Sequence, residues 1–120
     1  MPTYMLLIAA ADEDARSAAS QAERDEVYAA YTELSGDLSA RGAMRGGAEL
    51  DHSSTATCVR VRDGETVVTD GPYAEAVEQL GGYYQIAAAD MQEACTIAAR
   101  IPAARNGAVE VRPVMEFPTG

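Results

Sequence analysis

Apolar residues are spaced in two ways along this chain, and each spacing predicts strands of a different kind. Residues 4–9 are apolar at consecutive positions, which is typical of a central strand that is covered on both faces. Residues 55–62 alternate instead, and the pair Asp63 and Gly64 predicts a tight turn that joins them to residues 65–69 in a β-hairpin. Three further strands are predicted, at residues 48–50, 83–88 and 109–117.

A first amphipathic helix is predicted between residues 20 and 41. Ser20 and Glu23 have the spacing of a capping box, in which the hydroxyl binds a backbone amide of the first turn. An apolar stripe follows at steps of four, three and four residues, formed by Val27, Tyr31, Leu34 and Leu38. Gly42 then favours the end of the helix, since glycine readily adopts the left-handed conformation there.

A second helix is predicted after residue 90, where Asp90 and Glu93 repeat the capping spacing. Its core stripe consists of Met91, Ala94, Cys95, Ala98 and Ile101. Pro102 ends this helix, because proline lacks the amide that would continue it. A short helical turn is also predicted at residues 74–79.

The predicted order is strand, helix, strand, β-hairpin, strand, helix, strand. The segment Ile-Ala-Ala-Ala-Asp occurs at residues 8–12 and again at 86–90, each time where a strand leads toward a helix. This predicts one α+β domain over residues 1–120 with a ferredoxin-like split βαβ fold, whose two helices cover one face of an antiparallel sheet. No further element remains for the other face, so we expect a homodimer in which two sheets stack face to face.

The charge of the chain excludes two classes of partner. Asp and Glu number 19 against nine basic residues, all of them Arg, which gives a formal net charge of −10. Nucleic acids and anionic membrane surfaces need a basic footprint, so neither is expected as a partner. Because lysine is absent, a mechanism through a Lys Schiff base is excluded as well.

The N-terminal segment and the cysteines favour a cytoplasmic protein. The first apolar run is too short for a membrane span, and no basic segment of a signal peptide precedes it. Cys58 and Cys95 are 37 residues apart and lack the spacing of a zinc or redox motif. We therefore expect two small buried thiols in a reducing compartment.

Five segments in the same order carry a resemblance to a known family. They are residues 4–8, 55–64, 67–75, 78–84 and 109–117. The sequence Val-Val-Thr-Asp-Gly-Pro-Tyr-Ala-Glu in the third of them resembles the signature of the YCII-related family, in its DGPF branch. The resemblance covers nearly the whole chain.

This resemblance implies a dimeric α+β barrel, and little about function. An enzymatic role is associated with a His/Asp pair in other branches of the family. DGPF members are associated with genes for extracytoplasmic-function sigma factors. The chain departs from the branch at Tyr73, where the motif has Phe, and at Val77, where relatives often have Lys. No histidine lies on the first helix, so the His/Asp chemistry does not transfer intact.

Asp70 and His52 are the candidate catalytic residues, and each has a structural alternative. The motif is Asp70, Gly71, Pro72 and Tyr73, and an aspartate that opens such a turn can accept backbone amides as an Asx cap. As a general base it would need a raised pKa. His52, the only histidine, is either an exposed loop residue or the acid–base partner of Asp70.

Arginine and tyrosine side chains are the candidate ligand-binding groups. Arg60 and Arg112 (with Arg62) lie on strands, where they either pair with neighbouring glutamates or hold an anionic ligand. The tyrosines either line a cleft or pack in the core, and they are Tyr73, Tyr83 and Tyr84.

Two hypotheses of function remain open. Nucleotide-binding, nucleophile-elbow and zinc-protease motifs are absent from the sequence, so no cofactor and no metal are expected. The first hypothesis is an enzyme or binding protein for a small anionic or polar metabolite, with a cleft near the dimer interface. The second is a non-catalytic interaction module for a sigma factor or another regulator.

Overall fold

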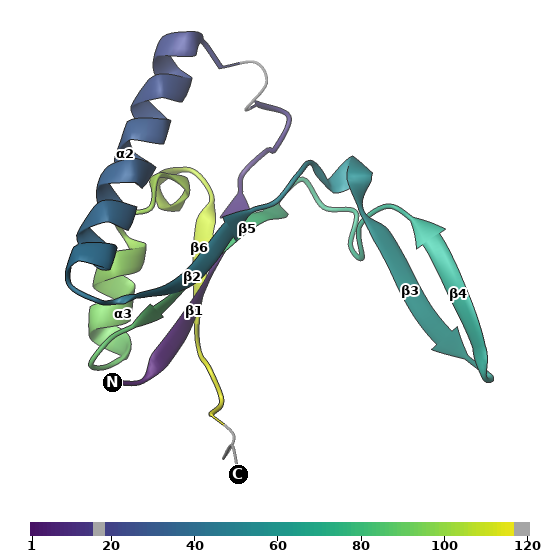
Figure 1. The fold of residues 1–120 in the computed structure, drawn as a ribbon. Helices are drawn as coiled ribbons and strands as arrows, with labels where there is room; N and C mark the ends of the chain where they lie inside the picture. The colour runs from purple at the N-terminus through teal and green to yellow at the C-terminus, as the bar shows by residue number, and fades with distance from the viewer. Residues whose placement is uncertain (16–18, 117–120) are drawn as a thin grey trace.

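The computed structural model describes residues 1–15 and 19–116. Four strands form an antiparallel sheet in the order β2-β5-β1-β6, and two helices lie on one face of it (Figure 1). Two more strands, β3 and β4, form a separate hairpin. The bounds are β1 Thr3–Ala10, α2 Gln21–Ala40, β2 Met44–Glu49, β3 Thr57–Arg62, β4 Glu65–Asp70, β5 Gln79–Ala87, α3 Met91–Ala98 and β6 Ala108–Pro113, with short 3₁₀ helices η1 Ser53–Thr55 and η2 Pro102–Arg105. The α+β class with a ferredoxin-like sheet is thereby confirmed.

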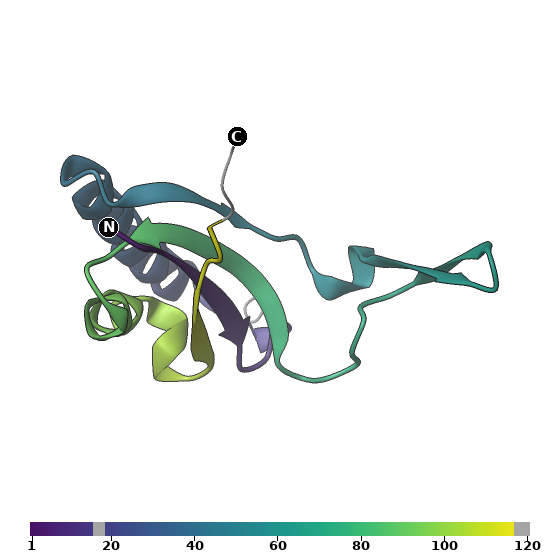
Figure 2. The same ribbon diagram turned by 90° about the horizontal axis from the view of Figure 1, so that it is seen from below.

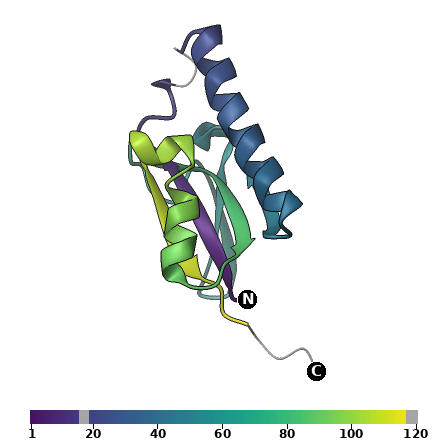
Figure 3. The ribbon, with the colours of Figure 1, turned by 90° about the vertical axis from the view of Figure 1, so that its left-hand side faces the viewer.

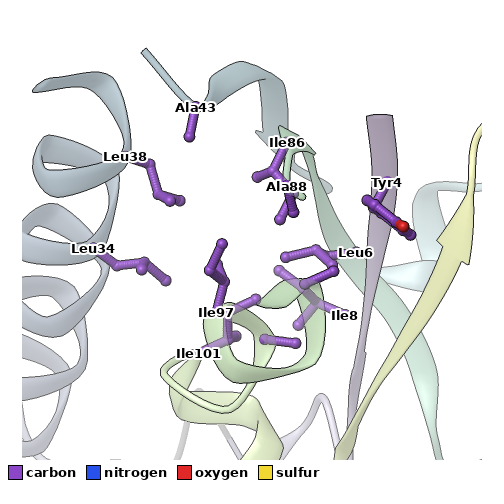
Figure 4. Close-up of a cluster of buried hydrophobic side chains, with 12 residues drawn as sticks. Tyr4, Leu6, Ile8, Leu34, Leu38, Ala43, Ile86, Ala88, Ile97 and Ile101 are labelled. Atoms are coloured by element: carbon purple, nitrogen blue, oxygen red, sulfur yellow. The ribbon is translucent and has the colours of Figure 1, made fainter. Parts of the chain in front are cut away.

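The core lies between the sheet and the helices. Alternate residues of β1 point toward the helices, and Leu6 is fully buried there beside Ile86 of β5 (Figure 4). Leu34 and Leu38 of α2 close the cluster from the other side. Burying each such aliphatic side chain contributes about 1.5–3 kcal/mol, so this layer supplies most of the stability of the body.

Helix α2 begins as predicted, and only its second half joins the core. The Ser20 Oγ accepts the Glu23 amide at 3.1 Å, which confirms the N-cap. Leu34 and Leu38 are buried, whereas Val27, expected on the same stripe, is exposed. In Figure 1 the first turns of α2 extend beyond the sheet, so they lie outside the layer in which sheet and helices pack.

Helix α3 also has the predicted cap, since Asp90 Oδ1 accepts the Glu93 amide at 2.8 Å. Its buried residues are Ala94, Ile97 and Ala98. Met91 and Cys95, predicted for the core stripe of this helix, are exposed instead. Seen from the side of the helices, α2 and α3 both lie in front of the sheet, with strands of the sheet visible between them (Figure 3).

The helical turn expected at residues 74–79 is absent, and β5 starts at Gln79 instead. The Gln79 side-chain amide donates to the carbonyls of Ala74 and Ala76, both at 2.7 Å. These bonds satisfy carbonyls that a helix would use for its own amides. β2 begins at Met44 rather than residue 48, and β6 ends at Pro113, while Phe117 of the expected last strand lies outside the described residues.

The hairpin formed by residues 57–70, here called the arm, projects away from the body of the molecule (Figure 2). Asp63 and Gly64 have φ values of 52° and 77°, as the predicted two-residue turn requires. The radius of gyration is 16.4 Å, whereas a compact chain of this length has about 13–14 Å. The projecting arm contributes to this expansion.

The face of the four-stranded sheet that the helices leave free is here called the open sheet face. It carries Met5 and Leu7 of β1 together with Tyr83 and Gln85 of β5, because these residues alternate with the buried ones. Within residues 1–15 and 19–116, no helix is long and apolar enough to cross a membrane.

Candidate functional site

The acidic segment Asp12–Asp14, which follows β1, contacts the loop that follows β2. The His52 Nε2 lies 2.7 Å from Asp14 Oδ1, although the two residues are 38 positions apart. On the other side of the ring, the Ser54 amide donates to Nδ1 at 3.1 Å, and the Ser54 Oγ lies 3.0 Å from the same nitrogen. The ring is thus held from both sides.

Glu13 reinforces this junction. Its carboxylate accepts the Ser53 amide at 3.0 Å and a hydrogen bond from the Ser53 hydroxyl. Its Oε1 also lies 3.5 Å from the His52 Nε2. Two carboxylates and one imidazole therefore connect the end of β1 to the 3₁₀ helix η1.

The hydrogen bonds and charges at the junction shift the pKa values of His52 and Glu13. The hydrogen bond to Asp14 raises the pKa of His52 above its ordinary value of 6.5, and the nearby carboxylates of Glu13 and Asp51 raise it further. The hydrogen bonds from Ser53 lower the pKa of Glu13. Because the Ser54 amide donates to Nδ1, the neutral ring carries its proton on Nε2 and donates it to Asp14.

An open hollow of about 490 Å³ lies next to this junction, and we call it the acidic hollow. The acidic segment forms one wall, and the segment that returns from the arm forms the other. Its lining residues are Asp12, Glu13, Asp14, Ser53, Pro72, Glu75, Ala76, Val77 and Gln79. Four carboxylates among them give the hollow a negative field that favours hydrogen-bond donors and cations.

Of the predicted motif, only Pro72 lines the hollow. Asp70 is exposed at the end of β4, and its carboxylate makes no hydrogen bond within the described residues. The Asx cap proposed for it is therefore not formed there. Gly71 instead closes the base of the arm, because its amide donates to the Ala56 carbonyl at 2.8 Å and its carbonyl accepts from the Cys58 thiol at 3.2 Å. Cys58 is half-buried there, not fully buried as expected.

The structure brings His52 to Asp14 rather than to Asp70. Arg60 lies over the ring of Tyr73, with 5.8 Å between the guanidinium carbon and the ring centroid. Arg112 lies on the open sheet face, where its Nε is 4.0 Å from Glu110.

The predicted tyrosines lie in three different places. Tyr73 is exposed beside the arm, and Tyr83 lies on the open sheet face. Tyr84 points toward the helices, where its hydroxyl lies 2.9 Å from Ser35 Oγ and its ring meets Tyr31 edge-on. The predicted site residues thus do not form one cluster within this chain.

Glu13 and Asp14 are the residues that sequence reasoning missed. The only signal was an acidic triplet at the end of a strand in a chain with a single histidine. That signal gives no distance between residues 14 and 52, which only the folded loops bring together. Within the part of the chain that the structure describes, no three His, Cys, Asp or Glu side chains are arranged to hold a metal ion.

Comparison with known proteins adds two findings. The model of the YCII-related domain matches residues 3–118. An uncharacterized protein of Rhizobium meliloti (strain 1021) is 34% identical over 111 residues, which cover 91% of this chain and 90% of that protein.

Proposed function

This chain belongs to the YCII-related family, and we propose that it binds a small polar molecule in the acidic hollow. We place it in the DGPF branch, in which the motif begins at Asp70. The observation that carries the proposal is the hollow itself, which combines a volume of about 490 Å³ with a lining of carboxylate, hydroxyl and amide groups. A volume of a few hundred Å³ is typical of a site for a small molecule.

The lining favours a ligand that donates hydrogen bonds or carries positive charge. An anionic ligand would need an arginine in the wall, and Arg60 and Arg112 lie on the arm and on the open sheet face instead. Amines, amino sugars and polyols present N–H or O–H groups that carboxylates accept. Of the two ligand classes expected from the sequence, the polar one is therefore the better fit.

Binding is a better fit than acid–base catalysis by His52. In the neutral ring, Nε2 donates to Asp14 and the lone pair of Nδ1 accepts from Ser54, so no nitrogen is left for a substrate proton. His52 then acts as a positioning residue that holds the acidic segment against the loop. This fixes one wall of the hollow before a ligand arrives.

The test is a thermal-shift screen with small amines, amino sugars and polyols. We expect at least one compound to raise the melting temperature of the wild type, as binding to the native state does. Glu75→Gln removes a carboxylate that lines the hollow, and Glu33→Gln makes the same change on the exposed surface of α2. The shift should fall in the first variant and persist in the second. If no compound gives a shift, or if both variants respond alike, the proposal is wrong.

The net charge of −10 favours a second candidate, an interaction module for a basic surface of an extracytoplasmic-function sigma factor. Binding of this kind weakens steeply with ionic strength, because exposed charges are screened. A pull-down with such a sigma factor at low and at high salt tests this candidate. A complex that forms at low salt and is lost at high salt is expected, and the absence of a complex at low salt would exclude the interaction module.

A further inference from the structure

The wall of the acidic hollow that returns from the arm has no regular secondary structure. Residues 72–78 connect the arm to β5 (Figure 2), and among the described residues their backbone forms no hydrogen bond to another backbone group. At the arm end, the amide of Gly71 is bonded to the Ala56 carbonyl. A segment of this length without backbone bonds of its own is expected to move unless side chains hold it.

Gln79 supplies this hold. It is the first residue of β5 and pairs with Ala10 at the end of β1, so its backbone belongs to the sheet. Its side-chain amide donates to the carbonyls of Ala74 and Ala76, both at 2.7 Å. A primary amide has two N–H donors, and two carbonyls at this distance use both of them. The side chain therefore ties the segment to the sheet.

The two carbonyls flank Glu75 in the sequence. The Ala74 carbonyl belongs to the peptide bond that leads into Glu75, and the Ala76 carbonyl comes after it. Both Glu75 and Gln79 line the hollow. A binding group is most effective when supporting hydrogen bonds lock its position. The bonds of Gln79 are placed to do this for the backbone that carries the Glu75 carboxylate.

The position of Gln79 also relates the two walls of the hollow to each other. The acidic segment begins at Asp12, two residues after Ala10, and Ala10 is the strand partner of Gln79. Both walls therefore leave the sheet near one pair of the β1–β5 ladder. The side chain of Gln79 thus fixes the return wall relative to the acidic wall, and not only relative to its own strand.

We propose that Gln79 is a positioning residue of the acidic hollow, which holds Glu75 in the wall before a ligand binds. This inference rests on the proposed binding function. Each wall is then fixed by one side chain, because His52 holds the acidic segment and Gln79 holds the return segment. A ligand that bonds to Glu75 loses less free energy to ordering, since the carboxylate is already in place.

The first test needs no ligand, so its outcome is independent of the binding function. Gln79→Met keeps the approximate length of the side chain and removes both donors. Gln92→Met makes the same change on the exposed surface of α3. We expect NMR relaxation to give order parameters near about 0.85 for the backbone of residues 74–76 in the wild type and in Gln92→Met, and below about 0.6 in Gln79→Met.

An order parameter below about 0.6 in the wild type would overturn the proposal, and so would equal values in the wild type and Gln79→Met. Circular dichroism shows whether the variant is folded. If Gln79→Met unfolds, it is replaced by Gln79→Leu, which also lacks the two donors.

The second test determines whether Gln79 acts on binding through Glu75. Glucosamine is the probe, because it carries an ammonium group and several hydroxyl groups, and NMR titration of the same samples gives its dissociation constant. We expect this constant to rise by about 2–10-fold in Gln79→Met and to stay unchanged in Gln92→Met. In a Glu75→Gln background, Gln79→Met should add less than about 2-fold, because the carboxylate that it positions is gone.

Equal effects of Gln79→Met with and without the Glu75 carboxylate would show that Gln79 supports the fold alone, and would overturn the proposal. Absence of glucosamine binding to the wild type would overturn it as well, even where the order parameters confirm that Gln79 holds the segment. The proposed binding function itself is wrong only if the whole thermal-shift screen is negative, so the two failures are distinguishable.

Discussion

The body and the arm are both built from paired antiparallel strands with alternating apolar residues, yet these strands lie in opposite environments. In β1, the residues of one face are buried, with Leu6 completely inaccessible. In β4, every residue is exposed. The difference arises because α2 and α3 cover one face of the body, while no element of the described chain covers the arm. An alternating pattern therefore identifies residues that share a face, and the packed elements determine whether that face is buried.

The body and the arm also differ in local stability. The body has a continuous apolar core between two layers, whereas the arm is held by one hairpin ladder. Regions with few buried apolar contacts open at a lower free energy than the core. In a single chain, the arm is therefore the least stable part of the regular structure.

The largest effect is expected from a truncation in the core of the body. Leu6→Ala leaves a cavity between β1 and the helices and should lower the free energy of unfolding by about 2–5 kcal/mol. Val67→Ala, a truncation in the arm, should change it by no more than about 0.5 kcal/mol. Urea denaturation followed by circular dichroism measures both, and similar losses would show that the arm is part of the cooperative core.

A smaller effect is expected where backbone segments approach closely in the body. A Cβ at Gly107 would overlap the Ala9 carbonyl and lie 2.9 Å from the Ala11 amide, so Gly107→Ala should destabilise the protein by about 1–3 kcal/mol. Gly36→Ala is the matched control. Gly36 lies inside α2, where a Cβ would meet no atom within 4 Å, so this substitution should stabilise the protein by about 0.5–1 kcal/mol. Thermal or urea unfolding measures the change in stability of each variant. A change of the same sign in both variants would contradict this account.

Gly64 lies in the turn of the arm, where a Cβ would have no atom within 4 Å but the backbone is left-handed. Gly64→Ala introduces no clash, yet an L-residue at φ 77° is disfavoured by about 1–2 kcal/mol. We expect faster amide hydrogen exchange in β3 and β4 and unchanged exchange in β1 and β5. Exchange that becomes faster in the body as well as in the arm, or that changes in neither, would exclude a turn that limits the local stability of the arm.

The smallest effect concerns the junction of His52 with the acidic segment. The raised pKa of His52 means that its cation stabilises the folded state below pH 6.5, and that this stabilisation is lost as pH rises through the folded-state pKa. NMR titration of the single histidine should give a pKa above 6.5. Asp14→Asn should lower it, while Asp63→Asn in the arm turn should not. If the pKa of His52 is the same in the Asp14→Asn variant as in the wild type, this result contradicts the observed hydrogen bond.

Much of the body could be predicted from the sequence because its signals are local. The caps at Ser20 and Asp90 and the turn at Asp63 depend on residues within three positions of one another, and all three are confirmed. The prediction that extended the stripe of α2 past the available packing surface was wrong at Val27, and Cys95 is exposed although its neighbour Ala94 in α3 is buried. Residues 74–79 do not form the expected helical turn because a side chain, that of Gln79, takes the carbonyls.

The sequence by itself determined the type of most elements, the residues that share each face and the negative charge of the chain, because these follow from spacing and composition alone. Only the tertiary structure decided that His52 meets Asp14, that the acidic segment and the return from the arm line an open hollow, and that the arm points away from its own sheet. Each of these depends on how loops far apart in sequence are placed by the packing of helices on a sheet. Residue spacing carries no information about that placement.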